Sequence, residues 1–195
     1  MWRAAGIVLC AACAACSPPP EKPGLFEEGE RLYLEGNYSA AAQAFKSRLL
    51  EKPDDAGAHF YLGTCYLYDK KNNWLGIAQG ELETALSLFE RQGKVSPVPR
   101  FDAEYFEIIC HVNKAKIYLL LVSLLIDNSI RYRDFRGGSL VPAIIEKCEE
   151  EARRAERVSA THPDVVWLRQ ELKKLTDEFG PMLRPRATPV PQFSA

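Results

Sequence analysis

Three cysteines near the amino terminus have the spacing that could hold a metal cluster. Cys10, Cys13 and Cys16 form a Cys-x2-Cys-x2-Cys run, a pattern that binds iron–sulfur clusters in some soluble domains. Here the run overlaps the apolar stretch Ala4–Ala15, which follows Arg3, and no fourth cysteine is close in sequence. An apolar stretch this short does not cross a bilayer and is typical of an export signal. We therefore expect an exported chain and no cluster.

The end of this segment resembles a bacterial lipoprotein signal, in which one cysteine accepts the lipid. Cys16 is the preferred acceptor, because Ala14 and Ala15 precede it and the proline-rich segment Ser17–Gly24 follows it. Cys13, which also has two alanines before it, stays open as the alternative. It also stands three positions before Cys16, where the family usually has leucine or a similar residue. An ordinary signal, cleaved without lipidation, is the other alternative.

The lipoprotein resemblance implies where the protein would be found. A proline-rich tether of the polyproline type would hold the following domain off the membrane surface. Serine after the acceptor, here Ser17, resembles signals that go on to the outer membrane. The resemblance therefore implies a protein of the cell envelope, anchored by lipid to the outer membrane and facing the periplasm.

A second candidate group is basic and aromatic, and it lies in the connection Ser129–Gly138. Arginine with aromatic neighbours can bind an anionic lipid, a glycan or an acidic partner. The alternative is that this segment is only a long connection inside an imperfect third hairpin. The residues of this candidate site are Arg131, Tyr132, Arg133, Phe135 and Arg136.

The remaining reactive residue types do not form a catalytic or metal-binding pattern. The histidines are His59, His111 and His162, and none is in a His-Glu-x2-His arrangement or beside a recognised nucleophile. The cysteines after the signal are spaced like small buried residues on helices, although export would permit one disulfide among Cys65, Cys110 and Cys148. The formal net charge of -1 gives no case for nucleic acid. We predict no enzyme, no metal and no cofactor.

The elements that position these residues are indicated by Leu25–Leu88, in which one amphipathic pattern occurs twice. Gly29 and Gly63 are 34 residues apart in the sequence. Two further pairs have the same separation, Phe26 with Phe60 and Leu32 with Tyr66. A repeat of this period is typical of a helical solenoid, in which each hairpin must stack on a neighbour to bury its apolar face.

The repeat resembles the tetratricopeptide repeat, whose pattern is Trp-x2-Leu-Gly-x2-Tyr, then Ala-x3-Phe, then Pro. In the first copy a turn at Gly36–Tyr38 precedes the matching residues Ala41, Phe45 and Pro53. In the second copy, with histidine in place of tryptophan, the matching residues are His59, Leu62, Gly63 and Tyr66. The second copy then departs from the family, with a longer turn at Asp69–Asn73 and no closing proline near Glu90.

The hydrophobic pattern predicts helices along the rest of the chain as well. Ile117–Ile126 is almost wholly apolar, so its helix should be the most buried, with a second transmembrane segment as the alternative. The last helix should close the solenoid as a cap, with Thr161 at its start. The predicted helices are Leu25–Glu35, Ser39–Lys52 after a cap at Asn37 or Ser39, Ala56–Tyr68, Trp74–Arg91, Phe101–Asn128, Ser139–Ala160 and Pro163–Phe179.

The predicted fold class is an all-α solenoid of tetratricopeptide-like hairpins. It has two clear repeats, an irregular third hairpin and a capping helix at the carboxyl end. With 47% hydrophobic and 26% charged residues, the composition is that of an ordinary globular domain. The predicted segments are a signal at 1–16, a tether at 17–24, the helical domain at 25–179 and a disordered proline-rich tail at 180–195.

The resemblance also implies a binding surface, because the first helix of each unit in the family lines the concave side. Repeats that clamp a terminal carboxylate have lysine and asparagine there, whereas this chain has Phe26 and Phe60. The resemblance therefore implies an apolar or aromatic-anchored ligand, a helix or an extended segment of a partner protein. The alternative is that both phenylalanines pack as core. The groove residues would be Phe26, Glu30, Tyr33, Phe60, Thr64, Leu67 and Tyr68.

These observations give one hypothesis for function and one alternative. The hypothesis is a membrane-anchored scaffold of the bacterial cell envelope, an adaptor or assembly factor that binds another protein through its concave surface. The alternative is a structural subunit that uses the same faces to self-associate into an oligomer.

Overall fold

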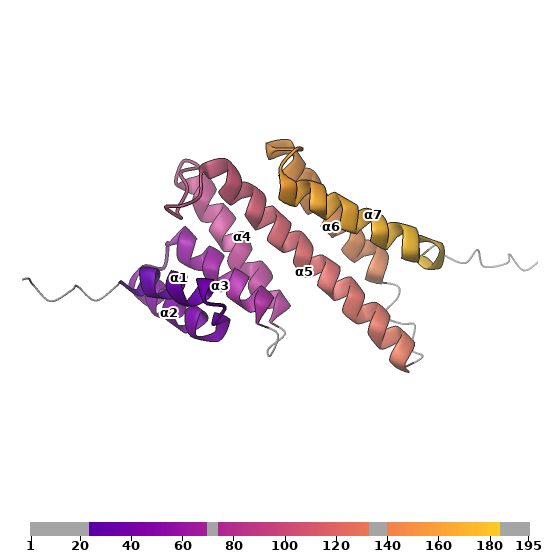
Figure 1. Cartoon of the computed structure of the whole chain (residues 1–195), viewed down its shortest axis with the longest axis horizontal. Coiled ribbons are helices and arrows are strands. Elements are labelled where there is room, and N and C mark those ends of the chain that lie inside the picture. The colour runs from indigo at the N-terminus through magenta and orange to yellow at the C-terminus, as the bar shows by residue number, and fades with distance from the viewer. Residues whose placement is uncertain (1–23, 70–73, 133–139, 184–195) are drawn as a thin grey trace, which may run out of the picture.

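The computed structural model describes residues 24–69, 74–132 and 140–183, and these residues form an all-α protein of seven helices (Figure 1). Each helix packs against the next one along the chain, so consecutive helices form antiparallel pairs. In addition, α1 contacts α3, α3 contacts α5 and α5 contacts α7. The helices are α1 (Leu25–Leu34), α2 (Tyr38–Glu51), α3 (Ala56–Tyr68), α4 (Leu75–Arg91), α5 (Ala103–Tyr132), α6 (Val141–Val158) and α7 (Pro163–Leu183).

The helix starts follow local capping chemistry. The Asn37 side chain accepts a hydrogen bond from the Ala40 N–H at 3.4 Å, which makes Asn37 the cap of α2. The Asp55 carboxylate accepts the corresponding bond from the Ala58 N–H at the start of α3. At α7 the residue before the first helical proline is His162, whose Nδ1 accepts from the Asp164 N–H at 3.3 Å. His162 therefore holds the cap position that we had predicted for Thr161.

The ends of the helices differ from the predicted ones by a few residues, as is usual for helix termini. The bounds of α3 agree with the prediction, and α1, α2 and α4 differ by a single residue at one or both ends. Two helices extend further at their carboxyl ends than the pattern indicated. Helix α5 continues to Tyr132, and α7 continues to Leu183, through Gly180 where we had predicted the tail to begin.

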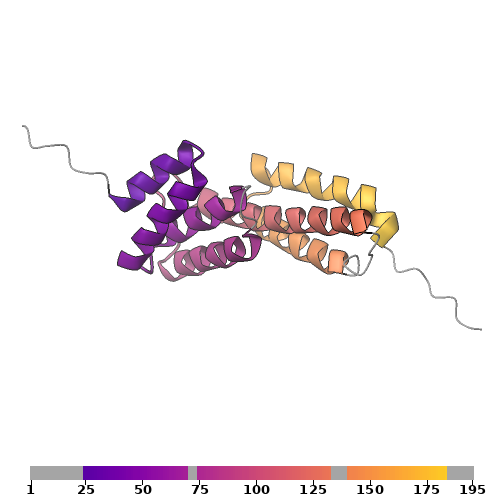
Figure 2. The same ribbon diagram turned by 90° about the horizontal axis from the view of Figure 1, so that it is seen from below.

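The core consists of two main clusters that meet along α5. Figure 2 shows α1–α4 at one end of the molecule and α6 and α7 flanking α5 at the other. One buried face of α5, with Phe106, Cys110 and Ile117, belongs to the cluster of the first four helices. Another face, with Ile108, Val112 and Ala115, belongs to the cluster shared with α6 and α7. All six residues are 0% exposed, so α5 is buried from two directions.

The length and composition of Ala103–Asn128 would also permit this part of α5 to cross a membrane. Its most apolar window is 61% buried against the rest of the protein. A central helix of a water-soluble core has the same properties, because it needs apolar residues on most of its faces.

Two glycines allow the helices of each hairpin to approach closely. A Cβ atom at Gly29 of α1 would lie 2.8 Å from the ring of Phe45 in α2. A Cβ atom at Gly63 of α3 would lie 3.0 Å from both the carbonyl oxygen of Ala78 and the Cγ atom of Leu82 in α4. Phe45 and Leu82 are themselves fully buried and have little room to move. The two glycines therefore play the same role in two successive hairpins.

This close approach predicts opposite effects for two glycine-to-alanine substitutions. Gly29→Ala should lower the free energy of unfolding by about 1–3 kcal/mol, because the added methyl group overpacks the contact with Phe45. Gly80→Ala in α4 is the matched control, since a Cβ atom there would meet no atom within 4 Å. It should raise stability by up to about 1 kcal/mol through helix propensity alone. Equal effects of both substitutions in urea unfolding would contradict the close approach at Gly29.

Candidate functional site: an apolar cleft between α3, α5 and α7

The residues predicted to line a groove do not share one open face. Phe60, Thr64 and Leu67 of α3 are buried, with exposures of 2%, 1% and 7%. The ring of Phe60 lies 5.8 Å from that of Phe101 and 5.3 Å from that of Phe106. Phe106 of α5 and Phe101 in the connection before it therefore cover Phe60, on the α3 face where we had placed the groove. The burial of Phe60 corresponds to the alternative, in which it packs as core.

The groove residues of α1 pack against α2 and α3. Phe26 makes edge contacts with the rings of Phe45 and Tyr61, at centroid distances of 5.7 and 5.8 Å. Tyr33 makes similar contacts with Tyr61 at 5.1 Å and with Tyr38. Both side chains are partly buried at the edge of the first core cluster. They hold the first two hairpins together.

Glu30, also assigned to the groove, belongs to a polar contact between α1, α3 and the α4–α5 connection. Tyr61 Oη donates to Glu30 Oε1 at 2.6 Å, and Arg100 Nε donates to the same oxygen at 3.0 Å. Arg100 Nη2 also lies 3.0 Å from Tyr61 Oη and donates to it. Burial and the bond to Glu30 raise the pKa of Tyr61. Glu30 is thus engaged by the chain itself.

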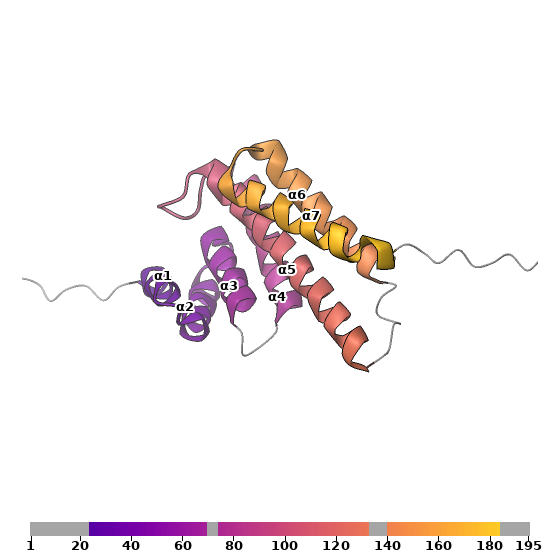
Figure 3. The same cartoon turned by 45° about the vertical axis from the view of Figure 1, so that its right-hand side comes forward.

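An apolar cleft of about 650 Å³ opens beside the carboxyl end of α3, between α3, α5 and α7. Three large apolar side chains at this cleft remain well exposed: Leu120 at 43%, Leu124 at 38% and Trp167 at 39%. Figures 1 and 3 show that the carboxyl half of α5 diverges from α3 and α4. The residues that line the cleft are Tyr66, Leu67, Tyr68, Asp69, Leu75, Lys116, Leu119, Leu120, Ser123, Leu124, Trp167 and Glu171.

Lys116 places a positive charge in this cleft, between rings from two other helices. Its Nζ atom donates a hydrogen bond to the hydroxyl oxygen of Tyr68, at 3.1 Å. The same atom lies 5.8 Å from the centre of the Tyr68 ring and 5.2 Å from that of the Trp167 ring. These are cation–π distances. Of the predicted groove residues, Tyr68 and Leu67 are the two that line the cleft.

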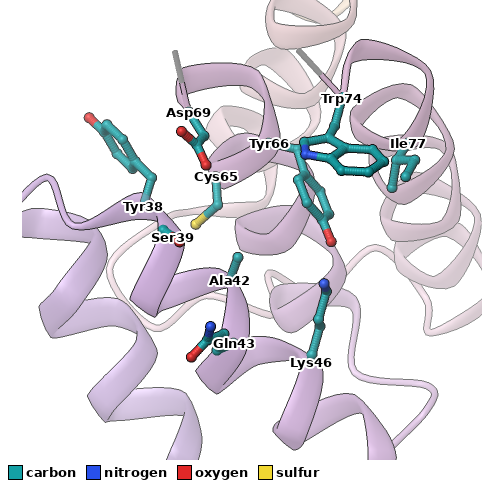
Figure 4. Close-up of a pocket in the computed structure, with 10 residues that line it drawn as sticks. All are labelled: Tyr38, Ser39, Ala42, Gln43, Lys46, Cys65, Tyr66, Asp69, Trp74 and Ile77. Carbon is teal, nitrogen blue, oxygen red and sulfur yellow. The ribbon is translucent and has the colours of Figure 1, made fainter. Parts of the chain in front are cut away.

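A smaller hollow of about 300 Å³ lies between α2, α3 and α4 (Figure 4). In the close-up Tyr66 and Trp74 lie side by side, and Lys46 points toward the Tyr66 ring. The Lys46 Nζ atom is 5.3 Å from the centre of that ring. The α3–α5–α7 cleft is about twice as large and has three exposed large apolar side chains, so it is the better candidate for binding a partner.

A buried charged network lies where α4, α5 and α6 meet. Glu151 of α6 is 5% exposed, and its two oxygens contact His111 Nδ1 at 2.6 Å and Lys114 Nζ at 2.9 Å. Lys114 also lies 3.5 Å from Glu83 of α4. Burial raises the pKa of Glu151, but the hydrogen bonds and charges of His111 and Lys114 lower it more, so the pKa lies below its ordinary value. We interpret this network as structural because His111, Lys114 and Glu151 are buried and satisfy one another, while Glu83 contacts Lys114 from the surface.

The three cysteines of the helical domain, Cys65, Cys110 and Cys148, are free and buried. Burial raises the pKa of Cys65 and of Cys148 to about 12 and that of Cys110 well above its ordinary value. Thiols in this state are poor nucleophiles. Within the described ranges, no group of three or more histidine, cysteine or acidic side chains could hold a metal ion.

Two predicted sites fall wholly or partly outside the described residues. Both lipid-acceptor candidates, Cys16 and Cys13, lie before Gly24, where the described chain begins. Of the basic aromatic group, Arg131 and Tyr132 form the end of α5. The other members, Arg133, Phe135 and Arg136, lie outside the described residues.

Comparisons with known proteins give no family for this chain. A scan against models of protein families, a search of curated proteins and a search of solved structures each found no match. The likeness to tetratricopeptide repeats therefore rests on the chain's own sequence pattern.

The buried network predicts that acid destabilises the fold through Glu151. The folded-state pKa of Glu151 lies below its ordinary value of 4.5. Its contribution to stability is therefore fully present above that value and is lost as the pH falls through the folded-state pKa. Glu151→Gln should remove this part of the pH dependence. Near neutral pH it should also lower the free energy of unfolding by about 3–5 kcal/mol, because it removes the buried carboxylate from Lys114.

Urea unfolding between neutral and acid pH tests this, with Glu150→Gln as the matched control. Glu150 pairs with Arg154 on the helix surface and its side chain is 53% exposed, so its loss should cost less than about 0.5 kcal/mol. If the two variants have the same stability at neutral pH, Glu151 does not hold the network together.

Proposed function

We propose that this protein is a membrane-anchored helical scaffold of the bacterial cell envelope, an adaptor or assembly factor that binds another protein. The observation that carries the proposal is the apolar cleft between α3, α5 and α7, in which Leu120, Leu124 and Trp167 stay exposed. Exposed apolar side chains gathered in one hollow are typical of protein-binding sites, whereas single ones are ordinary surface. The described residues that line the cleft are mainly apolar, so we propose that it binds a partner.

The packing of the helices supports a tetratricopeptide-like arrangement. In such a solenoid the first helix of a unit contacts the second helix of the preceding unit and also its first helix. Here α3 contacts both α2 and α1, α5 contacts both α4 and α3, and α7 contacts both α6 and α5. On this interpretation α5 and α6 are the irregular third hairpin and α7 is the capping helix. The cleft is then lined mainly by first helices, which form the concave side in the repeat family.

Photo-crosslinking can test whether the cleft binds a partner in the envelope. A benzoylphenylalanine residue at position 120 or 124 should form an adduct of defined mass, because these positions line the cleft. Position 95 is the matched control, since Val95 is also apolar and is 68% exposed, but lies in the α4–α5 connection. Leu124→Glu should abolish the adduct from position 120 without changing the melting temperature. Adducts of the same mass from all three positions would contradict a specific cleft.

The proposed anchor has its own test. Replacing the acceptor, Cys16→Ser, should move the protein to the soluble fraction or leave an unprocessed precursor, because stable anchoring needs more than one acyl chain and the modification supplies several. Palmitate labelling and membrane fractionation measure this. If labelling persists, Cys13→Ser becomes the decisive variant. Persistence in the double variant Cys13→Ser, Cys16→Ser would exclude a lipid anchor at either cysteine.

A further inference from the structure

The cleft differs from a purely apolar groove because a lysine lies in it without a carboxylate partner among the described residues. Lys116 contacts a hydroxyl group and two aromatic rings, which are neutral. A lysine ammonium has three N–H donors, and the bond to Tyr68 takes one of them. Donors therefore remain for a bound ligand.

The acidic residues that line the cleft have other interactions. Glu171 accepts a hydrogen bond from Lys174 Nζ at 2.5 Å, on the same helix. Asp69, at the α3 end, takes part in an interaction of its own. Charge complementarity in this cleft therefore favours a ligand with a negative group opposite Lys116.

The shape of the apolar surface favours a helix as the ligand. On α5, Lys116, Leu120 and Leu124 are spaced four residues apart, and on α7 Trp167 and Glu171 have the same spacing. Residues with this spacing form a ridge along one face of a helix. Two helices side by side, each with such a ridge, form a groove into which the apolar face of a third helix can pack. The ridge on α5 spans about 12 Å, or two turns of a bound helix.

We infer that the cleft binds an amphipathic helix of a partner protein. The apolar residues of that helix pack on Leu120, Leu124 and Trp167, and a glutamate or aspartate of the same helix pairs with Lys116. This rests on the proposed function and adds the chemistry of the ligand. The Tyr68 hydroxyl and the Trp167 ring position the lysine side chain, and the partner's carboxylate accepts a hydrogen bond from one of its remaining N–H donors. Such a charge-assisted bond beside an apolar surface discriminates between partners more than the apolar contacts alone.

Three synthetic helical peptides with leucine at positions i, i+4 and i+8 provide the probe. They differ at one position beside the leucine row, which is glutamate, glutamine or lysine, and each carries an uncharged fluorophore. Fluorescence anisotropy would use the full chain with Cys13→Ser and Cys16→Ser, so that no detergent competes for the cleft. The glutamate peptide should bind about tenfold more tightly than the glutamine peptide, which corresponds to one charge-assisted hydrogen bond. The lysine peptide should bind most weakly.

Variants of the protein then assign the preference to Lys116. Lys116→Met keeps the apolar part of the side chain. It should reduce the ratio of the affinities for the glutamate and glutamine peptides to about one, within the error of additive effects. Lys147→Met, an exposed site on α6 outside the cleft, is the matched control and should keep the ratio. Trp167→Ala should weaken the binding of both the glutamate and the glutamine peptide, and it should also lower the ratio of their affinities, because the Trp167 ring positions Lys116. Melting temperatures close to that of the parent chain would show that the variants are folded.

Several results would overturn the inference. Equal affinity for the glutamate and glutamine peptides would do so, and so would a preference that survives in Lys116→Met. Binding of dodecanoate but of no peptide would make the cleft a lipid site. If a chain ending at Leu183 bound the glutamate peptide more than tenfold better, residues 184–195 would be the ligand that occupies the cleft. A dimer that Lys116→Glu dissociates in light scattering would make a second copy the ligand.

The proposed function and this inference can fail separately. If the adduct from position 120 forms in the envelope and is unchanged by Lys116→Met, the cleft binds a partner but the carboxylate assignment is wrong. If no position in the cleft forms an adduct while the peptides show the expected charge preference, the chemistry of the cleft is right but its role in the envelope is wrong.

Discussion

The fold depends on burying α5 from two directions at once. Most of its residues between Phe106 and Tyr118 are buried, and no single group of helices covers them. The first four helices bury Phe106 and Ile117, whereas α6 and α7 bury Ile108 and Val112. Each group of helices has an incomplete core without α5, because α5 supplies residues to both. The two ends of the molecule are therefore coupled through one helix, and the cleft exists where only one of the two groups covers it.

The sequence was sufficient to predict the helices and their pairing. The 34-residue period and the amphipathic pattern are local properties, and they indicated antiparallel hairpins before any contact was known. The predicted cap at Asn37 is confirmed by its bond to Ala40. At α7 the prediction was wrong by one position, because proline is favoured at the first helical position and the residue before Pro163 is His162.

The candidate site could be predicted only in part. Helical spacing correctly placed Phe60 and Thr64 on one face of α3, but it does not say whether a later helix covers that face. Phe101 and Phe106, some forty residues on, provide that cover. The run Ile117–Ile126 shows the opposite difficulty. It is apolar on every side, so the sequence alone did not indicate which of its leucines stay exposed. That depends on where α3 and α4 diverge from α5, which is a property of tertiary packing.

The point of divergence lies next to the buried charged network. Glu83 of α4, Lys114 of α5 and Glu151 of α6 meet at one level along α5, and Lys116 and the cleft follow within a turn. A buried ion pair is weak evidence for stability, since apolar residues of the same volume often pack as well. It does restrict register, because a shift of α6 along α5 would separate Glu151 from both His111 and Lys114 and leave buried charges unpaired. We therefore attribute to this network the register of α6 along α5 within the third hairpin. Because α7 packs on both of these helices, their register also determines where α7 places Trp167 beside Lys116.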